Sequence, residues 1–188
     1  KLALAVMASN FFDNPSEKLQ LVGVTGTNGK TTVTSLLYQL FTKAGYKVGL
    51  LSTVRVMVGE KEYPATHTTP DSISINKYLH LMNEAGVEFC FMEVSSHGID
   101  QERTGGLTFK GGIFTNLSHD HLDYHKTFAA YRDVKKRFFD GLPAGDYRVQ
   151  VDTWQTANGL EEFFDNSHDW STASRVSVTA GSTVANVN

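Results

Sequence analysis

The sequence lacks the features that mark secreted, membrane-spanning and nucleic-acid-binding proteins. A single cysteine, Cys90, excludes an internal disulfide, and no cysteine and histidine residues lie at zinc-site spacing. No apolar run approaches the ~20 residues of a membrane span, and the apolar segment of residues 1–8 is shorter than a full signal peptide. With 17 Lys+Arg against 20 Asp+Glu, the net charge of -3 provides no basic field for nucleic acid or an anionic membrane. We therefore expect a reduced, cytoplasmic protein without nucleic-acid or membrane partners.

The chain length and the distribution of charged residues along it indicate one main domain with a distinct C-terminal end. A chain of 188 residues is typical of a single domain, and a first residue other than Met indicates a piece of a longer protein. Residues 1–150 carry 16 basic and 15 acidic residues, whereas residues 151–188 carry one basic and five acidic residues, so the net charge falls from +1 to -4. Residues 171–188 are rich in Ser, Thr, Asn, Ala and Val, which fits a strand pair or a disordered end.

Before that break, short apolar runs alternate with segments of helical periodicity. The runs predicted as strands are Leu19–Val24, Val48–Leu51, Phe89–Val94 and Gly112–Leu117, and residues 54–63 alternate around Gly59 as in a hairpin. The segments predicted as helices are Thr31–Ala44, a segment from Asp71 as N-cap to Gly86, and Phe128–Phe139. Because strands separated by helices form parallel sheets through crossovers, we expect an α/β fold with a mostly parallel sheet and flanking helices. Functional side chains of such a sheet lie at the carboxyl ends of its strands.

A glycine-rich loop joins the first predicted strand to the first predicted helix. Residues 23–32 read Gly-Val-Thr-Gly-Thr-Asn-Gly-Lys-Thr-Thr. Glycines allow successive backbone N–H groups to converge on phosphate oxygens, Lys30 reaches the outer phosphates, and the next hydroxyl, that of Thr31, can bind Mg²⁺. The general P-loop pattern has Gly where this chain has Val24, so the loop is a variant. The alternative is a glycine-rich turn before a helix, but the placement between strand and helix favours phosphate binding.

Polar residues also follow two later strands. Glu93 leaves the apolar run of residues 89–92, where a carboxylate either binds the Mg²⁺ of a nucleotide or serves as a structural group at the strand end. Residues 119–125 hold three histidines and two aspartates at a spacing that fits metal or phosphate binding, or a solvated helix cap. Together with the glycine-rich loop, these clusters favour a site for a hard cation and phosphate.

Two lysines, Lys135 and Lys136, lie on the last predicted helix, where lysines usually belong to a solvated face. An ammonium has three donors and no acceptor, so it cannot coordinate Mg²⁺ unless it is modified. Nothing in the composition or spacing indicates such a modification.

Three segments together resemble the Mur ligases, and within that family the MurE type. They are Thr25–Thr32, Met92–Gly98 and Phe114–His125, which follow the family's order and spacing over residues 2–142. The resemblance implies the central ATPase domain of a three-domain enzyme. Residues 1–18 would be the end of a preceding domain or a linker, residues 19–145 the ATP-binding domain, and residues 146–188 an unmatched tail. The N- and C-terminal domains of the same enzyme would be partners that this chain lacks.

The resemblance also implies roles for individual residues. ATP would be bound by Gly26, Thr27, Asn28, Gly29, Lys30, Thr31, Thr32 and Asn116. Mg²⁺ would be bound by Thr31, Glu93, His121 and Lys135, the last as a carbamate that carries oxygen acceptors. The muramoyl-peptide substrate would be bound by Thr68, Thr69, Ser95, Gln101 and Arg103, whereas His67 departs from the Asn that is common in the family. The catalytic residues would be Lys30, Lys135 and His121.

The activity implied by the resemblance is ATP-dependent amide-bond formation on UDP-MurNAc-L-Ala-D-Glu by a monomeric enzyme. ATP phosphorylates the D-Glu carboxylate, and the amine of a diamino acid attacks the acyl phosphate, in peptidoglycan precursor synthesis. Phosphoryl transfer needs positioning and charge neutralisation, which N–H groups, a lysine and Mg²⁺ supply. Two alternatives are a nucleotide-binding fragment without ligase activity and a ligase similar to folylpolyglutamate synthetase. Lysine and diaminopimelate are not distinguished as the added amino acid, because the selecting residues belong to the C-terminal domain of the family.

Overall fold

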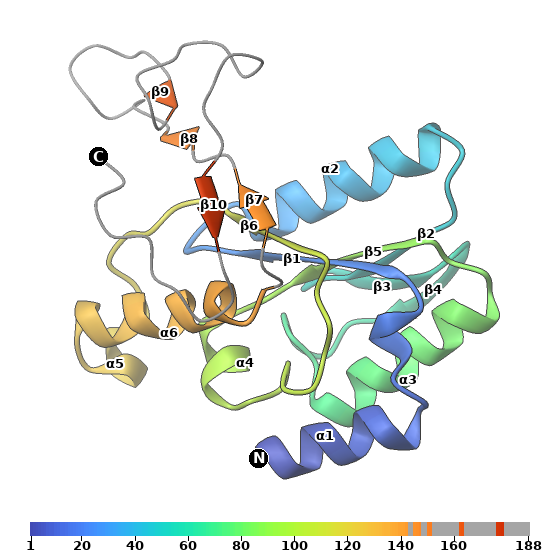
Figure 1. The fold of residues 1–188 in the computed structure, drawn as a ribbon, viewed down its shortest axis with the longest axis horizontal. Helices are drawn as coiled ribbons and strands as arrows, with labels where there is room; N and C mark the ends of the chain where they lie inside the picture. The colour runs from blue at the N-terminus through green and yellow to red at the C-terminus, as the bar shows by residue number, and fades with distance from the viewer. Residues whose placement is uncertain (143–144, 148–149, 152–161, 164–175, 179–188) are drawn as a thin grey trace. The chain divides into compact units, whose positions relative to one another are not determined.

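A computed structural model describes residues 1–142, 145–147, 150–151, 162–163 and 176–178, and the chain divides into two units (Figure 1). The first unit is Lys1–Leu142 and the second is Pro143–Asn188. In the second unit, β7 (Gly145–Tyr147) pairs antiparallel with β10 (Val176–Val178), and β8 (Gln150–Val151) pairs antiparallel with β9 (Glu162–Phe163). Most of residues 171–188, predicted as a strand pair or a disordered end, lie outside the described residues.

A six-stranded sheet forms the centre of the first unit, in the order β4-β3-β2-β5-β1-β6. Its strands are β1 (Gln20–Thr25), β2 (Val48–Leu51), β3 (Arg55–Val58), β4 (Lys61–Pro64), β5 (Phe89–Glu93) and β6 (Gly111–Phe114). β2, β5, β1 and β6 are parallel, and β3 and β4 add an antiparallel hairpin. The predicted mostly parallel sheet and the predicted hairpin are confirmed. The carboxyl ends of the four parallel strands therefore lie at the same end of the sheet.

Helices cover both faces of this sheet in a three-layer arrangement (Figure 1). They are α1 (Leu2–Phe11), the 3-10 turn η1 (Pro15–Glu17), α2 (Lys30–Lys43), α3 (Ser72–Glu84), α4 (Ser96–Asp100), α5 (Leu122–His125) and α6 (Phe128–Asp140). α2 lies on one face, and α3, α4 and α6 lie on the other, with α1 packed against α3. The Asp71 side chain accepts a hydrogen bond from the Ser74 N–H and caps α3, as the sequence predicts.

Side-chain alternation along β5 divides the core between the two faces. Phe91 packs in the cluster under α2, whereas its neighbours Cys90 and Met92 pack with α3 and α6 on the opposite face. All three side chains are 2% exposed or less, and burial on both faces explains why this strand reads as a continuous apolar run. The strand's last residue, Glu93, is also buried, at 1% exposed. A buried carboxylate needs polar partners, and these lie at the carboxyl end of the sheet.

The structure differs from the sequence prediction mainly at short or non-periodic elements. No helix is predicted for residues 1–18, because the apolar residues of α1 surround the helix instead of forming a stripe. α4 and α5 have five and four residues, which is too short for a periodic pattern. β6 ends at Phe114 and not at Leu117, because the following residues turn to hydrogen-bond the glycine-rich loop.

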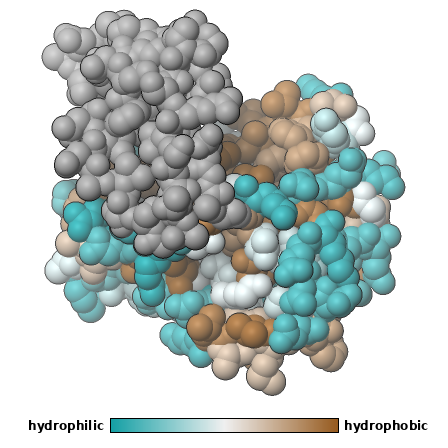
Figure 2. All heavy atoms as spheres, viewed as in Figure 1, coloured by the Kyte–Doolittle hydropathy of each residue, from teal (hydrophilic) through white to brown (hydrophobic). Residues whose placement is uncertain are grey.

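α1 presents an apolar surface to solvent. Figure 2 shows brown, hydrophobic atoms along the lower edge of the first unit, where α1 lies in Figure 1. The exposed apolar side chains of α1 are 40–82% exposed and comprise Leu2, Leu4, Val6, Met7 and Phe11. Contiguous exposed apolar surface is typical of contact sites. Among the residues that the structure describes, no helix has the length and apolar character needed to cross a membrane.

Candidate phosphate-binding and catalytic site

The glycine-rich loop leaves β1 and begins α2 at Lys30. Gly29 has a φ of 85°, in the left-handed region that glycine adopts without steric cost. The 14-residue helix that follows directs the positive end of its dipole at this loop, which favours anions. No side chain of the described residues caps this helix N-terminus. Its N–H groups are therefore available to phosphate oxygens, and the predicted strand–loop–helix placement is confirmed.

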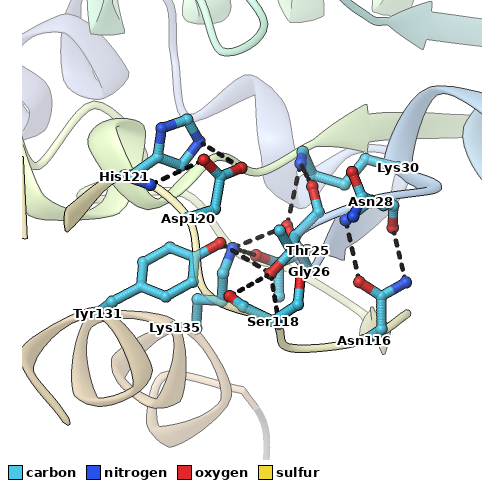
Figure 3. A network of polar contacts seen from close by, with 11 residues as sticks. Thr25, Gly26, Asn28, Lys30, Asn116, Ser118, Asp120, His121, Tyr131 and Lys135 are labelled. Carbon is cyan, nitrogen blue, oxygen red and sulfur yellow. Dashed lines mark hydrogen bonds and ion pairs between the residues drawn. The ribbon is translucent and has the colours of Figure 1, made fainter. Parts of the chain in front are cut away.

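Gly26 permits close packing between the loop and the residues after β6. A Cβ at Gly26 would overlap the Thr115 hydroxyl and lie 3.0 Å from the backbone N and O of Asn116. The Thr27 N–H donates to the Asn116 carbonyl (2.9 Å), and the Asn28 N–H donates to Asn116 Oδ1 (3.0 Å). Asn116 Nδ2 donates in return to the Asn28 carbonyl (3.1 Å), as Figure 3 shows. The structure therefore brings Asn116 to the loop as a partner of Asn28.

Lys30 lies inside the loop with its ammonium on two backbone carbonyls. Its Nζ donates to the Gly26 carbonyl at 2.9 Å and to the Thr27 carbonyl at 2.8 Å. Burial lowers the pKa of Lys30, and the carboxylates of Glu93 and Asp120 oppose the fall. A partly desolvated ammonium interacts more strongly with an anion than one in water. This position suits a lysine that neutralises phosphate charge.

Lys135 reaches the same carbonyl from α6. It is 3% exposed, its Nζ donates to the Gly26 carbonyl at 2.8 Å, and Nζ lies 4.8 Å from the centre of the Tyr131 ring (Figure 3). Burial and the nearby Lys30 ammonium lower the pKa of Lys135 from 10.5 to about 7, against the opposing effect of Asp120. The lowered pKa makes the neutral amine of Lys135 far more accessible near pH 7 than that of an ordinary lysine.

Lys136 provides the contrast on the same helix. Its side chain is 50% exposed and pairs with Asp140 one helical turn away, at 2.6 Å. The solvated-face alternative therefore describes Lys136 and does not describe Lys135.

The Glu93 carboxylate accepts three hydrogen bonds at the carboxyl end of β5. The Thr31 hydroxyl donates to Oε2 (3.0 Å), the Thr53 N–H donates to Oε1 (2.8 Å), and the Thr53 hydroxyl lies 3.2 Å from Oε2. In the described part of the chain, Glu93 forms no salt bridge. A buried carboxylate without an ion-pair partner favours a nearby cation. The structure thus joins two of the predicted metal ligands, Thr31 and Glu93.

The chemistry of this donor set fits Mg²⁺. Mg²⁺ prefers oxygen ligands and usually takes one or two protein carboxylates, with substrate phosphates and water completing its coordination. Thr31 and Glu93 offer a hydroxyl and a carboxylate beside the helix N-terminus. Among the described residues, no group of three His, Cys, Asp or Glu side chains is arranged to hold a metal. Nucleotide phosphates and water would supply the other oxygen ligands of a Mg²⁺ at Thr31 and Glu93.

His121 lies in a cluster of aromatic and imidazole rings and not on Glu93. Its Nε2 lies 3.6 Å from Asp120 Oδ2, and its ring centre lies 5.0 Å from that of His97. Burial, followed by neighbouring histidines, lowers the pKa of both His97 and His125. In the described residues, no hydrogen bond or ion pair joins His121 to Glu93. The structure therefore places His121 near the loop without showing it as a partner of the carboxylate.

Four of the five residues assigned by resemblance to the muramoyl-peptide substrate form one network. The Thr69 hydroxyl donates to the Glu93 carbonyl (2.9 Å) and accepts from the Ser95 N–H (2.9 Å). Arg103 donates from Nη1 to the Thr69 carbonyl (2.6 Å) and from Nε and Nη2 to Gln101 Oε1 (3.0 and 2.7 Å). The network connects the segment after β5 to the segment before α3, so a ligand bound there would lie beside the end of β5.

Three site residues were not selected from the sequence. Thr53 follows the end of β2 and lies 3.1 Å from the Thr68 hydroxyl, and the strand-end rule could have identified it. Asp120 belongs to the polar loop and acts electrostatically on the partly buried Lys30 and the buried Lys135. Tyr131 is fully buried, and its hydroxyl lies 3.0 Å from Thr27 Oγ1, but in the sequence it reads as an ordinary apolar helix position.

Phosphate binding by backbone N–H groups at a strand-to-helix loop defines the P-loop nucleotide-binding domains, and the first unit has this architecture. The chain belongs to the Mur ligase middle domain family, whose sequence model matches residues 24–180. This match confirms the resemblance noted in the sequence. It also runs past residue 145, into the segment for which the motifs provided no counterpart.

Curated relatives share high identity with part of this chain. The UDP-N-acetylmuramoyl-L-alanyl-D-glutamate--2,6-diaminopimelate ligase of Cytophaga hutchinsonii is 64% identical over 147 residues, which is 78% of this chain and 30% of that protein. A relative of the same name from Parabacteroides distasonis is 57% identical over 147 residues, with the same two coverages. The chain therefore spans about 30% of the length of these relatives.

Solved structures support the same fold. A structure of UDP-N-acetylmuramoyl-L-alanyl-D-glutamate--2,6-diaminopimelate ligase matches with a TM-score of 0.63 and 31% identity, over 73% of this chain and 29% of that one. E. coli FolC in complex with DHPP and ADP matches with a TM-score of 0.55 and 21% identity, over 75% of this chain and 38% of that one. The second likeness concerns the fold alone.

Proposed function

We propose that this chain is the ATP-binding middle part of a ligase that adds a diamino acid to UDP-MurNAc-L-Ala-D-Glu in peptidoglycan precursor synthesis. The observation that carries the proposal is the loop at Gly26–Thr32 with Thr31 bonded to Glu93, in a chain 64% identical to a ligase of that name. ATP phosphorylates the D-Glu carboxylate, and the diamino acid's amine then displaces phosphate to form the amide. The relatives' names favour 2,6-diaminopimelate over lysine as the diamino acid.

The chain's own residues would hold and neutralise the phosphates. Backbone N–H groups of the loop bind phosphate oxygens, and Lys30 exchanges its two carbonyl contacts for the outer phosphates. Thr31 and Glu93 would hold Mg²⁺, which when bound neutralises charge on the transferring phosphoryl group. His121, within the ring cluster beside the loop, is proposed as the further metal ligand and catalytic residue that the family resemblance assigns. These groups supply positioning and charge compensation, and no covalent enzyme intermediate is needed.

Lys135 is proposed to act as a carbamate. The neutral amine attacks the carbon of CO₂ and releases a proton, which leaves an anion with two oxygens beside the Lys30 ammonium. The lowered pKa, about 7, supports this reaction because it provides neutral amine at physiological pH. We expect ¹³C-labelled bicarbonate to give a carbamate NMR signal that Lys135→Arg abolishes and Lys136→Arg retains. A signal that persists in Lys135→Arg would exclude the assignment.

The remaining partners follow from the same proposal. Thr68, Thr69, Ser95, Gln101 and Arg103 would contact the muramoyl-dipeptide. The uridine and amino-acid sites would lie in flanking domains, which correspond to the roughly 70% of the relatives' length that this chain does not span. The exposed apolar residues of α1 are suited to packing against such a domain. We propose a cytoplasmic, monomeric enzyme that acts on small molecules and not on nucleic acid or membranes.

Two other functions compete with this one. A nucleotide-binding fragment would keep the loop and bind ATP without ligation. A ligase similar to folylpolyglutamate synthetase is favoured only by the likeness to FolC, which at 21% identity concerns the fold alone.

The deciding experiment measures phosphate release from ATP by this chain joined to the flanking segments of the Cytophaga hutchinsonii relative. Release that depends on both UDP-MurNAc-dipeptide and diaminopimelate supports the ligase. Release that depends on a folate substrate supports the competing ligase, and ATP binding without turnover supports the fragment. The chain by itself should not ligate, because holding the reactants in attack geometry contributes up to about 7–11 kcal/mol of the barrier.

A further inference from the structure

Thr53 provides two of the three hydrogen bonds to the buried Glu93 carboxylate. Its backbone N–H bonds Oε1 and its hydroxyl bonds Oε2, so one residue contacts both carboxylate oxygens. The third bond comes from the Thr31 hydroxyl to Oε2. Thr53 lies just beyond the carboxyl end of β2, the strand that pairs with β5. The contact is therefore a direct consequence of parallel strands ending side by side.

The three bonds saturate one carboxylate oxygen and leave the other open. A carboxylate oxygen has about two acceptor positions. Oε2 accepts the hydroxyls of Thr31 and Thr53, whereas Oε1 accepts only the Thr53 N–H. The remaining acceptor position, not used by any described residue, is on Oε1. The Thr53 contacts thus determine which oxygen of Glu93 is available to a cation.

The Thr53 hydroxyl also contacts Thr68, at 3.1 Å. The geometry allows the Thr53 hydroxyl to donate to Thr68 or to Glu93, but it has one hydrogen. When that hydrogen is on Glu93, Thr53 can accept from the Thr68 hydroxyl. In that arrangement, hydrogen bonds run from Thr68 through Thr53 to the carboxylate. It connects the loop before α3 with the end of β5.

We propose that Thr53 is a positioning residue, which holds the Glu93 carboxylate in the orientation that binds Mg²⁺-ATP and connects it to Thr68. The inference rests on the proposed function, because Mg²⁺-ATP is the ligand that it concerns. Groups that hydrogen-bond a metal ligand fix its orientation, and their removal typically costs about 10-fold to 100-fold in metal affinity. Thr53 acts through Glu93 and need not touch the nucleotide.

The test measures ATP binding to the 188-residue chain by calorimetry, with Mg²⁺ and with EDTA. Thr53→Val keeps the branched shape and the backbone N–H but removes the hydroxyl, and Thr53→Ser restores the hydroxyl. Thr42→Val is the matched control, because the Thr42 hydroxyl donates to the Tyr38 carbonyl near the far end of α2 and has no other partner in the part of the chain that the structure describes. We expect Thr53→Val to weaken Mg²⁺-ATP about tenfold with little effect in EDTA. Thr53→Ser and Thr42→Val should bind as the parent does.

A second arm tests the chain of hydroxyls. Thr68→Val should weaken Mg²⁺-ATP in the parent and have no further effect in Thr53→Val, because residues that act through one contact are not additive. Melting curves of each variant identify a loss of fold, which would lower affinity equally with and without Mg²⁺. Unchanged or Mg²⁺-independent affinity in Thr53→Val overturns the inference and leaves the proposed function intact. Failure of the parent chain to bind ATP overturns both.

Discussion

Replacing Lys135 by Met should remove a large pH dependence from the stability of this fold. Lys135 is 3% exposed, and its pKa is about 7 in the folded chain against 10.5 for an ordinary lysine. Between pH 7 and pH 10.5 the unfolded chain therefore binds a proton that the folded chain does not. The free energy of unfolding rises with pH across this window, and the destabilisation by the buried ammonium is complete below pH 7.

The structure sets the size of this effect. The difference of about 3.5 pKa units corresponds to at most about 5 kcal/mol, since each unit is worth about 1.36 kcal/mol. This is a large share of the ~5–15 kcal/mol that stabilises a typical domain. Lys135→Met keeps the length of the side chain without a titratable group, so its advantage over the parent should be greatest at pH 6–7 and decline toward pH 10.5.

Urea unfolding in CO₂-free buffers from pH 6 to pH 10.5 measures the difference between the two proteins. Removal of CO₂ keeps the amine free of carbamate during the titration. Lys136→Met is the control, because the Lys136 ammonium is half-exposed and pairs with Asp140; its effect should stay within about 0.5 kcal/mol of the parent at every pH. If the free energy of unfolding of the parent and of Lys135→Met changed in parallel with pH, the lowered pKa of the buried Lys135 would be refuted.

Three further predictions concern the loop and the core. Gly26→Ala should destabilise the fold by about 1–3 kcal/mol in urea unfolding and weaken ATP binding, because its φ is 146° and a Cβ would meet Thr115 and Asn116. Gly45→Ala, at a φ of 93° with open space around it, should show the smaller cost of backbone strain alone, and equal losses at both positions would contradict the packing argument. Thr31→Val should weaken Mg²⁺-ATP more than metal-free ATP in calorimetry, since only the cation needs the hydroxyl; equal losses would argue against a metal role. Cys90 is fully buried, and burial raises the pKa of its thiol, so a thiol reagent should label it only as fast as the fold opens. Rapid labelling of the native chain would show that β5 is less protected than its packing implies.

Local patterns in the sequence were sufficient for most of the first unit. β2 has the predicted bounds, Val48–Leu51, and α6 begins at the predicted Phe128 and ends one residue later than predicted. Alternation and helical periodicity depend on residues that are close in the chain, so each segment by itself indicates whether it forms a strand or a helix. α1 was not predicted, because its apolar residues form no one-sided stripe and so lack the helical periodicity on which the prediction depends.

Part of the candidate site was also predictable from local sequence, and part was not. The glycine-rich loop and the residue at the end of β5 were predicted from contiguous sequence, and the structure joins them through the bond from Thr31 to Glu93. The roles of Lys135 and of the Thr69 network came only from resemblance to a family. His121, which the family resemblance assigns as a Mg²⁺ ligand together with Glu93, lies next to Asp120 and His97, and its metal role stays a prediction.

By itself, the sequence determined the parallel α/β class, the phosphate loop and the polar residues at the strand ends, since each depends on residues that are close in the chain. Only the tertiary structure decided that Lys135 is buried on the Gly26 carbonyl, 109 residues away, and that Thr53 holds Glu93 across 40 residues. The physical reason is that desolvation and hydrogen bonding act over a few ångströms. Those distances depend on which strands the sheet places side by side and where each strand ends.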